Sequence, residues 1–142
     1  MKELVGWREW VALPEIGIKS LQCKVDTGAK NSALHAFELE SFERDGELWV
    51  RFSIHVDESD LTHIQRCEAR VIDTRTVTDS SGNQSERFFI ETMIKIGKQK
   101  YKIQVSLTDR DTMKYNMLLG RTALRKAKFI VDPSRSYLQG KK

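Results

Sequence analysis

Hydrophobic and polar residues alternate along most of this sequence, and a period of two is typical of β-strands that are buried on one face. The clearest alternating runs are residues 21–25, 48–56, 88–96 and 101–107. In the first run Leu21, Cys23 and Val25 are the apolar positions, which predicts that Cys23 is a small core residue. The sequence therefore predicts a fold that is mostly β.

Glycine-bearing turns separate these runs. Asp45-Gly46 marks one turn and Gly97-Lys98 marks another, which joins the last two runs as a hairpin. A third turn, Asp79–Asn83, joins residues 69–78 to residues 84–96. We expect these segments to form a long hairpin with a polar tip that moves as a unit.

One segment has helical character. Residues 121–128 are rich in Ala, Leu, Arg and Lys, and they end before the apolar run Phe129–Val131 and Asp132-Pro133. The chain has 142 residues and contains no internal repeat or linker, which is the size of one domain. The sequence predicts a single domain over residues 1–142, all-β in class, closed or sandwich-like, with one short C-terminal helix.

The composition is that of a folded, water-soluble domain, with 39% hydrophobic and 31% charged residues. No stretch approaches the roughly 20 apolar residues that a membrane span needs. The N-terminal residues lack the apolar run of a signal peptide, and Cys23 and Cys67 are expected to be free thiols. We therefore expect a cytoplasmic protein with no membrane association.

The net charge of +4 (24 basic minus 20 acidic residues) is unevenly distributed. Residues 1–94 hold 11 basic and 17 acidic residues, or −6, whereas residues 95–142 hold 13 and 3, or +10. The basic part is predicted to face an anionic partner. Charge alone does not choose between an acidic protein and a nucleic acid.

Two segments have the residue types that chemistry requires. The strand that ends at Val25 runs directly into Asp26-Thr27-Gly28-Ala29, which places a carboxylate, a hydroxyl and a flexible glycine at a strand end. Far downstream, the apolar run Met117–Leu119 ends at Gly120-Arg121, just before the predicted helix. An Asp-Thr-Gly sequence alone is also a common turn, so the combination carries the functional interpretation.

Together these segments resemble the retropepsin-type aspartic peptidases, whose pattern is an apolar strand into Asp-Thr-Gly-Ala, a flap hairpin, and two apolar residues before Gly-Arg at a helix start. More narrowly, residues 25–36, 117–121 and 131–138 resemble the bacterial retropepsin-like family that is commonly labelled ATP-dependent zinc protease. The resemblance implies the acid protease fold, a retropepsin-like closed barrel, and peptidase activity.

Aspartic peptidases use two carboxylates that share a proton, one as base toward water and the other as acid toward the scissile carbonyl. This chain has one Asp-Thr-Gly, because Asp73-Thr74 is followed by Arg75. A homodimer in which each copy donates Asp26 is therefore a condition of the mechanism. The resemblance implies that Thr27 hydrogen-bonds across the twofold axis and that Gly28 allows close approach of substrate or backbone.

The residues after this motif suggest the kind of substrate. Viral retropepsins follow Asp-Thr-Gly-Ala with acidic residues, whereas this chain has Lys30-Asn31-Ser32. A cation near the dyad favours acidic side chains, so we expect glutamate-rich peptides as substrates. The resemblance implies the same, since members of the narrower family are associated with ATP-grasp glutamate ligases that add glutamate tails to a ribosomal protein. The predicted substrate-binding residues are Ala29, Lys30, Ser32, Arg75, Ser81 and Gly82.

The sequence offers little for zinc or ATP. It contains no His-Glu-x-x-His and no phosphate-binding glycine loop, and His63 and Cys67 are four residues apart in a segment with no clear helical pattern. We expect no metal and no cofactor. Two alternatives stay open. The first is a non-catalytic β-barrel module that uses its basic face to bind an acidic protein or, less in keeping with the sequence, a nucleic acid. The second is a zinc-dependent peptidase.

Overall fold

The computed structural model describes residues 3–56, 62–78, 82–109 and 115–140. These residues form eleven strands, one 3-10 helix and one α-helix. In chain order the elements are β1 (Leu4–Val5), β2 (Arg8–Leu13), η1 (Pro14–Ile16), β3 (Ile18–Val25), β4 (Ser32–His35), β5 (Phe37–Arg44), β6 (Glu47–His55), β7 (Ile64–Thr78), β8 (Gln84–Ile96), β9 (Gln99–Thr108), β10 (Met117–Leu119), α1 (Arg121–Ala127) and β11 (Ile130–Val131).

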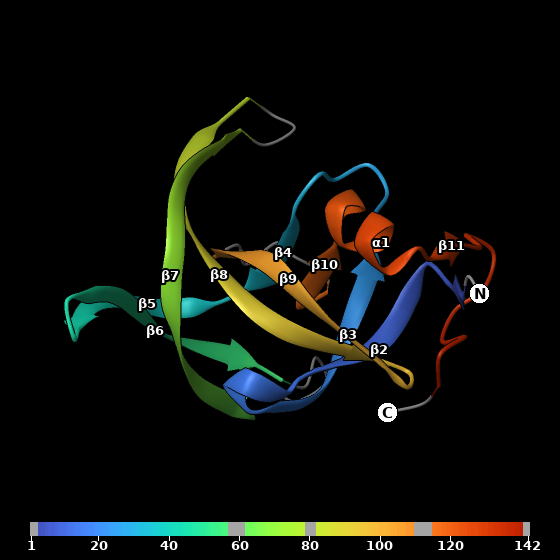
Figure 1. Ribbon diagram of the computed structural model, residues 1–142, viewed down its shortest axis with the longest axis horizontal. Coiled ribbons are helices and arrows are strands. Elements are labelled where there is room, and N and C mark those ends of the chain that lie inside the picture. Colours follow the sequence, from blue (N-terminus) through green and yellow to red (C-terminus); the bar gives the residue numbers. More distant parts are fainter. Residues whose placement is uncertain (1–2, 57–61, 79–81, 110–114, 141–142) are drawn as a thin grey trace.

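Nine strands form one sheet in the order β2-β3-β10-β4-β9-β8-β7-β6-β5. An additional pairing of β2 with β8, through Ala12 and Lys95, closes the first six of these strands into a ring (Figure 1). The predicted mostly β fold with one short helix is confirmed. No helix in the described part of the chain is long and apolar enough to cross a membrane.

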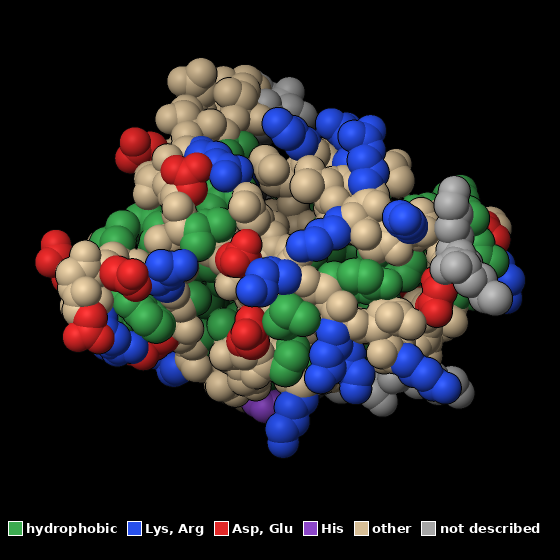
Figure 2. Space-filling view, viewed as in Figure 1, with side chains coloured by type: hydrophobic (Ala, Val, Ile, Leu, Met, Phe, Trp, Pro, Cys, Tyr) green, Lys and Arg blue, Asp and Glu red, His purple; other side chains and the backbone are tan. Residues whose placement is uncertain are grey.

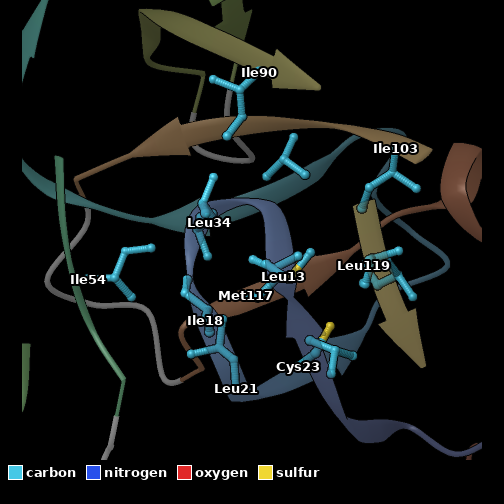
Figure 3. Close-up of a cluster of buried hydrophobic side chains, with 14 of the residues drawn as sticks. Leu13, Ile18, Leu21, Cys23, Leu34, Ile54, Ile90, Ile103, Met117 and Leu119 are labelled. Atoms are coloured by element: carbon cyan, nitrogen blue, oxygen red, sulfur yellow. The ribbon is translucent and has the colours of Figure 1, made fainter. Parts of the chain in front are cut away.

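The ring encloses the hydrophobic core. Figure 3 shows side chains from β2, β3, β4 and β10 that converge inside the ring, and most of them are almost completely buried. Leu21 and Cys23 are 0% exposed and Val25 is 7% exposed, as the alternation of β3 predicts. Each large apolar side chain that is buried in this way contributes about 1.5–3 kcal/mol to folding.

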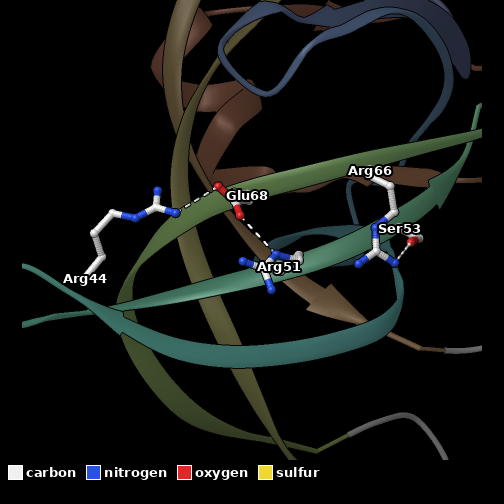
Figure 4. A network of polar contacts seen from close by, with 5 residues as sticks. All are labelled: Arg44, Arg51, Ser53, Arg66 and Glu68. Atoms are coloured by element: carbon white, nitrogen blue, oxygen red, sulfur yellow. Dashed lines mark hydrogen bonds and ion pairs between the residues drawn. The ribbon is translucent and has the colours of Figure 1, made fainter.

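Strands β5, β6 and the first part of β7 continue the sheet as an arm beyond the ring. On one face of the arm, Glu68 forms ion pairs with Arg44 at 3.2 Å and with Arg51 at 3.0 Å (Figure 4). Arg66 donates a hydrogen bond to the Ser53 hydroxyl at 2.8 Å. The ion-paired side chains of Arg44, Arg51 and Glu68 are 37–42% exposed, so each ion pair contributes little to stability.

The predicted long hairpin is confirmed. Strands β7 and β8 pair in register up to Thr78 and Gln84, and the Asp79–Ser81 part of the predicted turn lies outside the described residues. The free end of this hairpin and the loop that follows β3 lie on the same side of the ring (Figure 1). The hairpin therefore extends on the side of the ring that carries this loop, which is the side where a flap is expected.

A buried carboxylate joins the two ends of the described chain. Glu9 on β2 is 1% exposed, and its carboxylate accepts hydrogen bonds from the backbone N–H groups of Gly6 at 2.6 Å, Leu138 at 2.9 Å and Gln139 at 3.0 Å. Strands β1 and β11 pair in parallel beside it. The Glu9 hydrogen bonds fix the C-terminal segment next to β2.

Candidate active site

The sheet topology places the two motifs side by side. Strands β3 and β10 are parallel neighbours, with Val25 opposite Leu119. The backbone N–H of Asp26 donates to the carbonyl of Leu119 at 2.9 Å. Asp26-Thr27-Gly28 therefore starts directly beside Gly120-Arg121, although the two motifs are far apart in the sequence.

A short hydrogen bond within the loop orients the Asp26 carboxylate. The backbone N–H of Gly28 donates to Asp26 Oδ1 at 2.9 Å. A β-carbon at Gly28 would lie 3.2 Å from the same oxygen, which is tighter than ordinary contact. Asp26 is half-buried, while Thr27 and Gly28 are exposed. The loop thus presents one carboxylate oxygen in a fixed position and leaves room around it.

The start of α1 holds this loop from the other side. The backbone N–H of Arg121 donates to the carbonyl of Ala29 at 2.7 Å, and that of Thr122 donates to Lys30 at 3.2 Å. The Arg121 guanidinium donates to the carbonyls of Gly28 at 3.2 Å and Thr27 at 3.4 Å. Backbone N–H groups that have no partner inside the helix are therefore satisfied by carbonyls of the Asp26 loop.

Gly120 and Ser32 complete this support. A β-carbon on Gly120 would lie 2.6 Å from the Asn31 carbonyl, so the backbone approaches too closely for any other residue. The N–H of Gly120 donates to the Ser32 hydroxyl at 3.0 Å, and Ser32 is 2% exposed. Ser32, which the sequence analysis assigns to substrate binding, is placed here as a buried support for the loop.

A groove of about 510 Å³ lies between the Asp26 loop and the β7–β8 hairpin. It has walls from both elements and a floor from β4, β9 and β10. The residues that line it are Asp26, Gly28, Ala29, Lys30, Asn31, Ala33, Val77, Thr78, Arg87, Ser106 and Leu118. Four of the predicted site residues, namely Asp26, Gly28, Ala29 and Lys30, therefore meet in one groove.

The other predicted residues lie elsewhere. Thr27 lines a neighbouring cleft of about 670 Å³, together with residues of α1 and β11. Gly82 is exposed near the hairpin tip with φ +86°, and Ser81 lies outside the described residues. Arg75 is not among the residues that line the groove, and its Nε donates to Asp73 at 2.6 Å.

The groove also contains residues that the sequence analysis does not single out, of which Arg87 on β8 is charged. Arg87 lies directly opposite Arg75 across the hairpin. The register of the hairpin, counted from its turn, is the signal that pairs the two residues. Choosing between them requires the directions of their side chains, which the alternation does not give.

Lysine and arginine side chains gather around α1, and others lie toward the free end of the β8–β9 hairpin (Figure 2). The α1 segment alone contributes Arg121, Arg125 and Lys126, and Lys128 follows directly. The basic C-terminal part of the sequence therefore forms a basic surface beside the Asp26 loop. Such a surface attracts acidic ligands at a distance.

Neither cysteine has the properties of a nucleophile. Burial raises the pKa of the Cys23 thiol far above its usual range, and the Glu9 carboxylate raises it further. Burial likewise raises the pKa of Cys67 to about 11, although Arg66 opposes this effect. Both thiols are therefore protonated at neutral pH.

The described residues offer no cluster of three or more His, Cys, Asp or Glu side chains that could hold a metal ion. Cys67 lies on β7, and the residues that follow it continue as a strand up to Thr78. The spacing of His63 and Cys67 therefore does not correspond to one face of a helix.

These features define a retropepsin-like fold: a ring-like β-sheet, an Asp-Thr-Gly loop at a strand end, a hairpin on the same side of the ring and Gly-Arg at a helix start. The family model described as "Retropepsin-like aspartic endopeptidase RimB" matches residues 4–142. The chain belongs to this RimB-like family, which confirms the resemblance inferred from its sequence.

Two similar curated proteins are named "Probable alpha-L-glutamate ligase", which differs from the endopeptidase description of the family model. The protein from Shewanella pealeana is 39% identical over 141 residues, which is 99% of this chain and 31% of the relative. The protein from Desulfotalea psychrophila is 42% identical over 133 residues, which is 94% of this chain and 28% of the relative. The chain thus spans about three tenths of the length of these relatives.

A solved structure has the same fold. The Legionella pneumophila protein Lpg0085, described as having unknown function, superposes with a TM-score of 0.81 and is 27% identical. The match covers 98% of this chain and 99% of that one.

Proposed function

We propose that this chain is an aspartic endopeptidase that hydrolyses peptide bonds with a dyad of two Asp26 carboxylates, one from each copy of a homodimer. The observation that carries this proposal is the position of Asp26, which lies in a groove under the β7–β8 hairpin and is oriented by the N–H of Gly28. Membership of the RimB-like family supports it.

The dyad needs one proton for its two carboxyl groups. The ionised Asp26 accepts a proton from water, and the water oxygen forms a bond to the carbonyl carbon of the substrate. The protonated Asp26 of the other copy donates its proton to the carbonyl oxygen. In the second half of the reaction a carboxyl group protonates the amide nitrogen, the C–N bond breaks, and the hydroxyl proton of the intermediate returns to the dyad.

The supporting groups keep the carboxylate in place during these steps. The helix start and the Arg121 guanidinium fix the carbonyls of residues 27–30, so the loop does not need to reorganise on binding. In the proposed dimer the exposed Thr27 lies next to the twofold axis, where its hydroxyl binds the equivalent loop of the second copy. The β7–β8 hairpin is the flap that covers the substrate and excludes water.

We further propose that the substrates are glutamate-rich peptides or proteins. Lys30 lines the same groove as Asp26, and the basic surface around α1 lies beside it. The relatives named as glutamate ligases support this choice, because a similar segment is part of their chains. A glutamate-tailed ribosomal protein in the cytoplasm is the partner that fits this chemistry.

Peptide cleavage by the wild-type chain and by the Asp26→Asn variant tests the proposal. The wild type is expected to cleave glutamate-rich peptides faster than neutral ones, and Asp26→Asn is expected to cleave neither. Lys30→Glu is expected to reverse the preference for acidic peptides. Cleavage that survives in Asp26→Asn would contradict the mechanism, and binding of acidic peptides without any cleavage would favour the non-catalytic module.

A further inference from the structure

We propose that Arg87 on β8 is a specificity-determining residue, which binds a carboxylate side chain of the substrate from the flap side while Lys30 binds it from the loop side. The inference rests on the proposed function, because it concerns the same groove. It adds a residue to which neither the sequence motifs nor the family description assigns a role.

The charged side chains of the groove come from two different elements. Among the described residues that line it, the ionisable side chains are Asp26, Lys30 and Arg87. Lys30 belongs to the loop after β3, whereas Arg87 belongs to the hairpin above that loop. A peptide that enters between them therefore meets a cation on each wall, and a carboxylate on the peptide would be attracted by both.

The register of the β7–β8 hairpin pairs Arg87 with Arg75. Arg75 and Arg87 are directly opposite each other in antiparallel strands, so their side chains start on the same face of the hairpin. They then take different directions. The Arg75 guanidinium reaches Asp73 at 2.6 Å and Gln104 at 3.3 Å, and it lies 4.3 Å from the centre of the Phe89 ring.

Arg87 instead extends toward the hairpin tip, where its Nε donates to the hydroxyl of Ser85 at 3.3 Å. Ser85 is opposite Val77, which also lines the groove. Arg75 is bonded to Asp73 and is not among the residues that line the groove, whereas Arg87 is among them. This assigns to Arg87 the role that sequence analysis gave to Arg75.

The chemistry of arginine fits a side-chain carboxylate. A guanidinium presents several N–H donors in a planar fork that matches two carboxylate oxygens, whereas an uncharged amide cannot take up the same charge-assisted hydrogen bonds. A site of this kind should distinguish Glu from Gln, which have nearly the same size. It should also disfavour Lys at the same position.

The test uses two peptides that differ by one Glu→Gln replacement beside the scissile bond, and it measures kcat/KM for each. In the wild type the Glu peptide is expected to be cleaved faster. In Arg87→Gln the Glu-to-Gln ratio is expected to fall at least about tenfold, which is the size expected for losing a hydrogen bond to a charged group. Arg87→Lys should retain part of the ratio, since it keeps the charge and loses the fork.

Two comparison variants separate this role from a change in net charge. Arg75→Gln alters the opposite residue of the same hairpin, and Arg70→Gln removes an arginine that pairs with Glu47 on the arm. Both are expected to leave the Glu-to-Gln ratio within about twofold of the wild type. A ratio that falls in Arg75→Gln and not in Arg87→Gln would overturn the assignment.

Binding to a catalytically silent chain separates this inference from the proposed activity. Fluorescently labelled Glu and Gln peptides are titrated with Asp26→Asn and with the double variant Asp26→Asn/Arg87→Gln, and anisotropy reports binding. Preferential binding of the Glu peptide that disappears in the double variant supports the inference even if no peptide is ever cleaved. Equal binding of both peptides by Asp26→Asn, or an unchanged preference in the double variant, would overturn it.

Discussion

The hydroxyl of Ser32 accepts a hydrogen bond at 3.0 Å from the backbone N–H of Gly120, a residue 88 positions away in the sequence. Both residues are buried, and this bond connects the end of the Asp26 loop to the start of α1. Replacing Ser32 with Ala would leave the Gly120 N–H buried without its partner.

We expect Ser32→Ala to lower the free energy of unfolding by about 1–3 kcal/mol, which is the cost of an unsatisfied buried donor. Urea unfolding at pH 7 measures this change. Ser41→Ala on the exposed edge of β5 is the matched control and should change stability by less than about 0.5 kcal/mol. Equal effects of the two substitutions would show that the Ser32 hydrogen bond contributes no more to stability than the exposed hydroxyl of Ser41.

The close approach at Gly120 gives a second prediction. A β-carbon there would lie 2.6 Å from the Asn31 carbonyl and 3.0 Å from that of Ala29, and backbone atoms cannot swing aside as a flexible side chain can. We expect Gly120→Ala to cost about 2–3 kcal/mol of stability and to displace the Asp26 loop.

Gly46→Ala provides the comparison for this substitution. Gly46 has φ +78° but meets no atom within 4 Å, so only its backbone strain, about 1 kcal/mol, is expected. Thermal and urea unfolding of both variants measure the difference. A cost at Gly120 no larger than at Gly46 would contradict the tight contact.

Arg121 is expected to act by positioning the loop. Its guanidinium donates to the carbonyls of Thr27 and Gly28, and it is partly exposed, so its removal should affect geometry more than stability. We expect Arg121→Met to lower kcat about 10–100-fold with a smaller change in KM, because small displacements of reacting groups are costly. Arg121→Lys should recover part of kcat, and a variant whose KM alone changes would argue for a substrate contact instead.

The thiols give a prediction about pH. Since the pKa of Cys67 is about 11, only about one thiolate in a thousand is present at pH 8, and Cys23 has fewer still. Alkylation by iodoacetamide in the folded protein is expected to be slow at pH 8 and to rise about tenfold per pH unit up to pH 10. Unfolding in urea should make both thiols react quickly, whereas rapid labelling of the folded protein at pH 8 would contradict the burial of both residues.

Much of the fold follows from local patterns. The alternation in residues 48–56 and 101–107 corresponds to β6 and β9, and the helix-forming segment 121–128 corresponds to α1, which ends one residue earlier. Asp45-Gly46 forms the turn between β5 and β6, with positive φ angles of 53° and 78°. In these segments the local preference and the tertiary structure agree.

Other elements have no such local signal. Strand β5 is an acidic edge strand in which Glu38 has a φ of 54° and the register with β6 shifts between Phe37 and Glu40. The role of Glu9 depends on N–H groups about 130 residues away. Contacts of this kind are produced by the closed topology and cannot be derived from residue spacing.

In the candidate site, too, some residues follow from the local sequence and others only from the fold. The sequence identifies Asp26 and Lys30 because they belong to one contiguous motif, and the structure places both in the groove. The sequence analysis selects Arg75 from the hairpin, whereas Arg87 is the arginine that lines the groove and Arg75 is bonded to Asp73. Residues of one contiguous motif are thus named together by the sequence, whereas residues that meet across the fold, such as Arg87 and Lys30, require the structure.

The dependence of activity on two Asp26 residues is the central claim, and a mixed population of chains tests it directly. Wild-type and Asp26→Asn chains are co-expressed in equal amounts with different tags, so that they assort at random, and activity per total chain is measured on a glutamate-rich peptide. If both Asp26 residues of a dimer are needed, about one quarter of the wild-type activity should remain, because about one dimer in four is fully wild type. A value of about one half would show that each chain acts alone, and it would contradict the dyad.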